Sequence, residues 1–292
     1  MQHQAQRPSL LAPYGGLRPP APQWFDAALA QAPERSHFEV DGAAIELLVW
    51  GPLGAPGLLF LHGNAAHADW WSHIVPAFAG RYRCAAISWS GMGRSDWRER
   101  YAIGLYAREI LGAIDAAGLA ASGVPPVGIA HSFGSFPLLH AAIVHAERLA
   151  GVVMVDSLLP GLPPERATAS QGRARQYATI ADALVRFRFL PEQGSKMPFV
   201  VDLMARGGLR RVEQADGGHH FAWCFDPELW PKLRAGSPYI GLPGQVTLPA
   251  ALIYGEHSAV VSPDRMLARS TQWAFENDLG ALDRHAGVQR TP

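Results

Sequence analysis

One serine lies in a short pattern of small residues that is typical of a nucleophile. Ser132 stands in the stretch Ala130-His131-Ser132-Phe133-Gly134, between an apolar run and a stretch with helical spacing. A tight strand-to-helix turn requires small residues at both flanks, because bulk there would force the strand and the helix apart. Such a turn places the hydroxyl at a helix N-terminus, where the helix dipole and unpaired N–H groups favour a developing anion. The pattern predicts a serine nucleophile, although a serine that only caps a helix would give the same letters.

The elements around this serine alternate between strands and helices. Two runs, 37–40 and 45–50, flank an Asp41-Gly42 turn signal and predict a hairpin. Further strands are expected at 57–61, 83–87, 127–130, 149–155 and 250–254, and helices at 69–79, 103–117 and 134–146. Strands that alternate with helices indicate βαβ units, so we expect an α/β fold with a mostly parallel sheet flanked by helices.

Composition divides the chain into three parts. Residues 1–36 are rich in proline and are expected to form an N-terminal arm that is either flexible or laid over the surface. Residues 37–159 and 246–292 carry the α/β pattern and form the expected core. Residues 160–245 have few runs of strand type and are too long for a plain loop, which predicts an inserted helical cap or lid.

Several motifs in order resemble the α/β-hydrolase superfamily over roughly residues 40–285. His62-Gly63 follows the 57–61 strand, as in the family's oxyanion loop, and the stretch Ser90-Gly91-Met92-Gly93-Arg94-Ser95 resembles its G-x-G-x-S loop. The serine turn comes about 40 residues later, and the insertion follows the 149–155 strand, where the family usually has its cap. The resemblance implies a serine hydrolase that cleaves an ester, thioester, lactone or amide of a small, largely apolar molecule without a cofactor.

The family's order of catalytic residues along the chain is serine, acid, histidine. The usual acid position, in a G-x-x-D loop after the penultimate strand, is here Ser258. Asp156 ends the strand that follows the serine turn, at the edge of the sheet where ligands bind, and it is the predicted acid. A capping role for Asp156 in the turn is the alternative, and Glu256 and Asp264 remain open as acids.

A serine hydroxyl is a weak nucleophile without a base. The family places its histidine in the loop after the last strand, where this sequence has His285. The strand expected before it, 275–282, is interrupted by polar residues and a glycine. His285 is the predicted base, with His257 and His131 as weaker alternatives.

The family's oxyanion hole implies two backbone donors, the N–H of Phe133 and the N–H of Asn64. A plain left-handed turn at Gly63-Asn64 would explain those two residues equally well. The His62-Gly63-Asn64 stretch also looks like that of haloalkane dehalogenases. Both that group and the epoxide hydrolases need an aspartate nucleophile, so a serine at position 132 argues against either activity.

Tryptophans are candidates for an apolar substrate cleft. Trp70, Trp71 and Trp223 are the predicted substrate-binding residues, with Trp97 and Trp230 as further candidates. Ordinary core packing is the alternative for each of them. His219-His220 suggests a metal site, but neighbouring side chains on an extended chain point to opposite faces, so no metal is predicted.

Composition excludes several partners. The chain of 292 residues carries 25 basic and 25 acidic side chains, so nothing indicates nucleic-acid binding. Its two cysteines, Cys84 and Cys224, cannot build a disulfide framework. No apolar run is long enough for a membrane span and the N-terminus lacks signal-peptide character, so a cytoplasmic protein is expected. The oligomeric state is left open.

Two other functions are compatible with the same sequence. A cofactor-independent oxygenase or lyase on this fold would keep its turnover without Ser132 and depend on a His–Asp pair. A non-catalytic protein would bind a small molecule under the cap with a degenerate triad.

Overall fold

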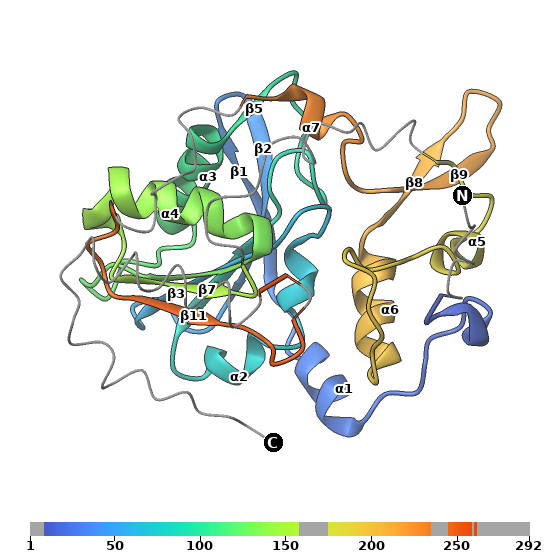
Figure 1. Cartoon of the computed structure of the whole chain (residues 1–292), viewed down its shortest axis with the longest axis horizontal. Coiled ribbons are helices and arrows are strands. Elements are labelled where there is room, and N and C mark those ends of the chain that lie inside the picture. The colour runs from blue at the N-terminus through green and yellow to red at the C-terminus, as the bar shows by residue number, and fades with distance from the viewer. Residues whose placement is uncertain (1–8, 158–174, 235–244, 259, 262–292) are drawn as a thin grey trace.

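The computed structural model describes residues 9–157, 175–234, 245–258 and 260–261. Within them, seven strands form one sheet in the order β1-β2-β4-β3-β6-β7-β11 (Figure 1). The strands are β1 (Glu34–Val40), β2 (Ala43–Trp50), β3 (Gly57–Leu61), β4 (Arg83–Ile87), β6 (Val127–His131), β7 (Gly151–Val155) and β11 (Ala250–Ile253). From β4 to β11 all neighbours are parallel, while β1 and β2 pair antiparallel. The predicted α/β fold class is confirmed.

The hairpin of β1 and β2 turns at the predicted dipeptide. Asp41 and Gly42 both have positive φ, 47° and 73°, as the tightest hairpin turns require. The first strand begins at Glu34, three residues before the expected start of the hairpin at 37.

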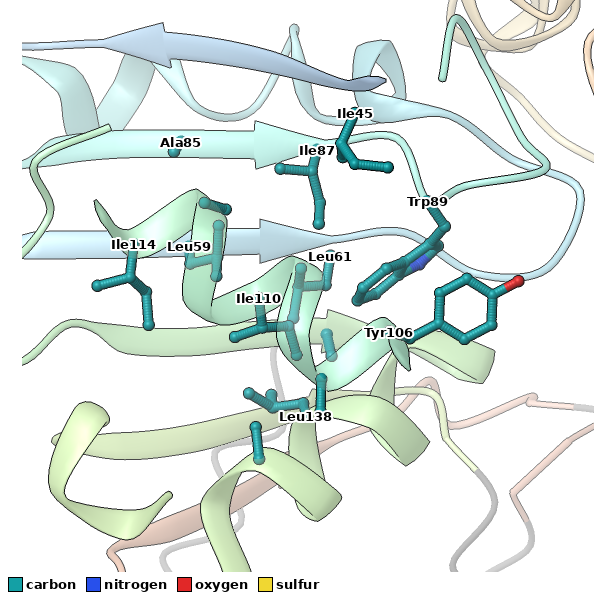
Figure 2. Close-up of a cluster of buried hydrophobic side chains, with 14 of the residues drawn as sticks. Ile45, Leu59, Leu61, Ala85, Ile87, Trp89, Tyr106, Ile110, Ile114 and Leu138 are labelled. Carbon is teal, nitrogen blue, oxygen red and sulfur yellow. The ribbon is translucent and has the colours of Figure 1, made fainter. Parts of the chain in front are cut away.

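Both faces of the parallel strands are covered, which explains the unbroken apolar runs in the sequence. In β3, Leu59 and Leu61 point into a core under α3 (Ile103–Ala116) and α4 (Ser135–Val144). Figure 2 shows these two side chains together with Ile110 of α3 and Leu138 of α4. The alternate residues Leu58 and Phe60 pack on the opposite face, in a second core that includes Trp71 and Val75.

The second face is covered by two short helices instead of the single helix expected over 69–79. These are η2 (Ala68–Trp71) and α2 (Pro76–Ala79). Pro76 lacks the N–H that a continuing helix would need, and it stands at the first position of α2, where that loss is harmless. The expectation of one helix was therefore wrong.

Most of the described segment between β7 and β11 forms a group of elements beside the sheet, while its last helix lies next to the core (Figure 1). Its described residues, 175–234, contain α5 (Ile180–Leu184), α6 (Pro198–Gly207), β8 (Leu209–Glu213), β9 (His219–Trp223), α7 (Leu229–Lys232) and β10 (Leu233–Arg234). The strands β8 and β9 form an antiparallel hairpin. The segment thus combines helices with a hairpin, where the sequence predicts helices alone.

One end of this inserted segment is fastened to the loop after β4. The Asp226 N–H donates to Gly91 O at 2.7 Å, and its carboxylate accepts from the Tyr101 hydroxyl at 2.9 Å and from Lys232 Nζ at 2.7 Å. Strand β10 also pairs with β5 (Tyr101–Ala102). The inserted segment is therefore anchored to the core next to the end of the sheet.

The N-terminal residues are ordered against other parts of the chain. They include η1 (Ala12–Tyr14) and α1 (Gln23–Leu29), and Leu11 is only 2% exposed. The short helices η3 (Ser132–Gly134) and η4 (Ala146–Arg148) complete the described elements. In the described ranges, no helix has the length and apolar character needed to cross a membrane.

A buried glutamate supports the loop after β4. Glu109 of α3 is fully buried and accepts hydrogen bonds from the Ser90 N–H at 3.0 Å and from Arg98 Nη2 at 3.3 Å. Burial raises the pKa of Glu109 to about 7, against the opposing effects of Ser90 and Arg98. Because the folded-state pKa lies above the ordinary value of 4.5, protonated Glu109 stabilises the fold below pH 4.5. That contribution is lost as the pH rises through about 7.

We predict that the free energy of unfolding of the wild type falls relative to Glu109→Gln as the pH rises from about 5 to about 8, by about 1–3 kcal/mol. Glutamine has no proton to lose, so the variant lacks the pH dependence of the free energy of unfolding that Glu109 causes. Urea denaturation at several pH values measures the difference. Glu99→Gln, at an exposed position, is the control, and its free energy of unfolding should change with pH in the same way as that of the wild type. Parallel curves for Glu109→Gln and the wild type would contradict the prediction.

Candidate active site

Ser132 lies on a strained turn at the end of an inner strand. Strand β6 ends at His131, Ser132 has φ of +50°, and η3 begins at once and leads into α4. A positive φ is uncommon for residues other than glycine, and such strain gathers at functional sites. The side chain is half-buried, so it remains accessible.

The turn depends on small residues because the loop after β3 packs directly against it. A Cβ on Gly134 would lie 2.7 Å from His62 O, and a Cβ on Gly63 would lie 3.2 Å from Ser132 Cβ and 2.9 Å from His131 Nδ1. Ala130 is fully buried. The loop that begins at Gly63 is therefore in contact with the serine turn.

His62 braces this loop and is not a base. Its Nδ1 donates to Gly63 O at 2.7 Å, and its Nε2 accepts from the Trp89 N–H at 3.1 Å, which fixes the tautomer. The Trp89 indole N–H donates back to His62 O at 2.9 Å. Burial lowers the pKa of His62 to about 3, so the ring is neutral at physiological pH.

The predicted oxyanion donors lie on two sides of the serine turn. The Phe133 N–H belongs to the first turn of a helix, where N–H groups have no intrahelical acceptor. Asn64 follows Gly63 in the contacting loop and is half-buried. The left-handed residue of that loop is Ala65, with φ of +54°, whereas the sequence suggested Gly63-Asn64 for such a turn.

Asp156 lies level with Ser132 on the neighbouring strand. The pairing of β6 with β7 sets His131 opposite Val155, so the residues that follow them, Ser132 and Asp156, leave the sheet side by side. Asp156 also has a positive φ, +46°. Its N–H donates to Ile253 O at 2.7 Å. Asp156 Oδ1 is buried and has no hydrogen-bond partner among the residues that the structure describes.

Ser157 fixes the end of β7 to the serine turn. Its hydroxyl is hydrogen-bonded to the hydroxyl of Ser135 at 2.6 Å and donates to Val155 O at 3.0 Å. Because each hydroxyl has one hydrogen, Ser135 then donates the bond between the two serines, and its oxygen lies 3.3 Å from Ala130 O. Sequence reasoning missed this pair of serines, and the only signal for it was a small polar residue after each of the two strands.

The other candidate acids and bases are placed less favourably or lie outside the described residues. Glu256 and His257 are exposed. The Ser258 hydroxyl, at the family's usual acid position, accepts from the Val260 N–H at 3.0 Å and the Val261 N–H at 2.9 Å, so it caps a turn. Asp264 and His285 lie outside the described residues.

His131 sits beside the nucleophile within packed surroundings. Its ring stacks on Trp70 at a centroid distance of 6.2 Å and an interplanar angle of 28°. Burial lowers the pKa of His131, and the nearby Asp156 carboxylate opposes that effect.

The three predicted substrate tryptophans are placed very differently. Trp70 lies between His131 and Phe189 of the inserted segment, at 6.1 Å from the Phe189 ring. Trp71 packs on Phe60 in the core beneath the sheet, which is the ordinary packing role and not a cleft position. Trp223 packs on Tyr177 and Phe187 within the inserted segment.

The two further candidates also have aromatic or cationic neighbours. Trp230 packs edge-on against Phe133 at 5.8 Å, and Trp97 lies under the Arg210 guanidinium at 4.5 Å.

His219 and His220 are successive residues of β9. In the part of the chain that the structure describes, no group of three or more histidine, cysteine or acidic side chains is placed to hold a metal ion.

The geometry agrees with the comparisons to known proteins. The model of the alpha/beta hydrolase fold family matches residues 56–225, and this chain therefore belongs to that family. The sequence is 27% identical over 144 residues to epoxide hydrolase A of Mycobacterium tuberculosis, covering 48% of this chain and 43% of the relative. It is 27% identical over 112 residues to a pimeloyl-[acyl-carrier protein] methyl ester esterase of Edwardsiella ictaluri, covering 38% and 40%.

These matches span less than half the length of the two curated relatives. Among solved structures, a thioesterase domain from the curacin biosynthetic pathway superposes with a TM-score of 0.65 at 22% identity, over 85% of this chain and 90% of that one. At that identity the likeness shows the fold alone. The names of the curated relatives support an enzyme of the hydrolase type.

We predict that Gly134→Ala destabilises the protein by about 1–3 kcal/mol, because the new methyl group would collide with His62 O and push the helix from the strand. Gly80→Ala is the matched control, since φ there is −69° and nothing lies within 4 Å of the new Cβ. It should be neutral or slightly stabilising. Urea denaturation of both variants checks this, and equal stability of the two would contradict the described contact.

Proposed function

We propose that this chain is a serine hydrolase that cleaves an ester, thioester, lactone or amide bond of a small, largely apolar substrate through an acyl-enzyme. One observation carries the proposal. Ser132 lies on a left-handed turn beside Asp156, whose Oδ1 is buried without a partner in the described ranges. A buried carboxylate oxygen without a hydrogen bond is costly, which favours a donor arriving from elsewhere in the chain.

In the proposed mechanism, Ser132 Oγ attacks the carbonyl carbon of the substrate. His285 takes the hydroxyl proton and passes it to the leaving group as the bond to the carbonyl carbon breaks. Asp156 orients the imidazole and stabilises its charged form. The N–H groups of Phe133 and Asn64 hold the negative oxygen. In the second half of the reaction His285 takes a proton from water, the water oxygen bonds to the acyl carbon, and the bond from that carbon to Ser132 Oγ breaks as His285 returns the proton to Oγ, which releases the acid.

The identity of residue 132 favours acyl transfer over epoxide opening. Epoxide hydrolase A is the name of one relative, but the resemblance to that group requires an aspartate nucleophile at position 132. A serine there fits the chemistry named by the esterase relative.

Residues 160–245 are proposed as the lid of this site. Trp70 contacts both His131 of the serine turn and Phe189 of the inserted segment, which supports a substrate position beside Trp70. Both cysteines are free and buried, which fits the proposed cytoplasmic location.

We predict that Asp156→Asn lowers kcat for p-nitrophenyl esters by up to about 10⁴-fold while KM changes little, because an amide cannot stabilise an imidazolium. Glu256→Gln and Asp264→Asn are the controls and should keep near wild-type rates. Circular dichroism confirms the folding of each variant. A near wild-type kcat for Asp156→Asn, with a collapse in one of the controls, would move the acid role to that residue.

The same assay with Ser132→Ala tests the reaction class. Loss of ester hydrolysis is expected. Turnover that survives Ser132→Ala and still requires Asp156 would indicate an oxygenase or lyase instead.

A further inference from the structure

The N-terminal residues are fastened to the inserted segment. The Ser9 hydroxyl donates to Leu184 O at 3.0 Å, and Arg206 Nη2 donates to Gly16 O at 3.0 Å. Leu11 is buried in one apolar cluster with Leu184, Val201 and Ala205. Residues 9–16 therefore complete the core of the inserted segment, although Ser9 and Leu184 are 175 residues apart in sequence.

The same N-terminal stretch then reaches the main core. The Phe25 ring of α1 packs on Phe199 of α6 at 4.9 Å and on His73, which lies between η2 and α2, at 6.0 Å. Figure 1 shows α1 between α2 and α6. Residues 9–29 thus form a strap from the inserted segment to the core.

A pocket of about 240 Å³ lies where the strap meets the inserted segment. It is lined by Leu10 of the strap and by residues 187–189 and 192–194 of the inserted segment. It is smaller than cavities that enclose whole drug-sized ligands, typically about 300 Å³ or more, so it suits one part of a molecule.

The pocket is joined to the serine turn by consecutive ring contacts. Phe189 lines the pocket and meets Trp70 edge-on at 6.1 Å, with an interplanar angle of 83°. Trp70 stacks on His131, the residue before Ser132. Trp70 therefore lies between Phe189 of the pocket lining and the residue that precedes the nucleophile.

The lining favours an uncharged occupant. Its surface is mostly apolar, from Leu10, Phe187 and Phe189. Arg188 is the basic residue of the lining, and its Nη1 donates to Val185 O at 3.1 Å and to Phe187 O at 2.7 Å. The guanidinium is engaged in holding its own loop. Glu192, the acidic residue of the lining, is exposed at the solvent side, so the apolar wall made by Leu10, Phe187 and Phe189 is the part that an apolar group would contact.

We propose that this pocket receives the unbranched apolar chain of the ester substrate, and that the strap sets the accepted chain length through Leu10. The assignment rests on the proposed serine hydrolase function. Leu10 is a specificity-determining residue in this account, contributed by a segment outside both the core and the insertion.

The test compares Leu10→Trp with Leu17→Trp, a control in the same strap at a position that is 75% exposed. Substrates are p-nitrophenyl acetate and p-nitrophenyl decanoate. Because an indole would fill the pocket, Leu10→Trp should lower kcat/KM for the decanoate about tenfold or more, since each buried methylene contributes about 0.8 kcal/mol. Hydrolysis of the acetate should stay near the wild-type rate, as should both reactions of Leu17→Trp.

A second variant guards against a folding defect. Gln193→Trp fills the same pocket from its exposed wall and should give the same selective loss. If neither variant changes the preference between acetate and decanoate, or if both substrates are lost equally in folded protein, the proposal is overturned.

A measurement of decanoate binding tests the proposed pocket independently of the proposed hydrolase activity. Decanoate is titrated calorimetrically into Ser132→Ala with and without Leu10→Trp, and Leu10→Trp should weaken binding about tenfold. If the wild type hydrolyses no ester, the serine hydrolase function fails, yet weaker decanoate binding would still support the pocket. If hydrolysis requires Ser132 but decanoate binding is unaffected by Leu10→Trp, the function stands and the pocket is refuted.

Discussion

The left-handed backbone at Ser132 is the constraint on which the rest of the site depends. Such a conformation costs on the order of 1–3 kcal/mol outside glycine and persists only where the surroundings hold it. Here it is held by contact between Gly134 and the carbonyl of His62, and by Gly63 against Ser132 itself. The parallel pairing of β3 with β6 supplies that contact, because the two strands end at the same edge of the sheet.

Neighbouring parts of the fold transmit this arrangement to the remaining site residues. The neutral His62 ring connects the loop after β3 to Trp89, in the loop after β4. The hydroxyl pair of Ser135 and Ser157 ties the end of β7 to the helix that follows Ser132. Asp156 consequently emerges beside the serine with its own left-handed backbone. Left-handed backbone strain is therefore present at two adjacent residues, Ser132 after β6 and Asp156 after β7.

Local patterns in the sequence were sufficient for the sheet and the serine turn. The run 57–61 is a strand with the predicted bounds. Its side chains are buried on both faces of the sheet, which is why all of them are apolar. The break at Pro76 was also readable from the chemistry of proline, although a continuous helix was expected.

Long-range packing could not be predicted from the same patterns. The placement of Trp71 in the core and of Trp70 beside His131 depends on which face of a short helix meets the sheet, and two adjacent tryptophans do not specify it. Residues 9–16 pack against α5 and α6, which are far away in sequence, so a local sequence pattern does not predict this contact. The proline-rich composition indicated only an arm.

The nucleophilic role of Ser132 is the central claim, and covalent labelling measures it most directly. Protein is incubated with a fluorophosphonate probe, digested and analysed by mass spectrometry, with Ser132→Ala beside the wild type. The account predicts one phosphonylated residue, Ser132, in the wild type and no label in the variant. Equal labelling of the two proteins, or a wild-type adduct on another residue, would contradict it.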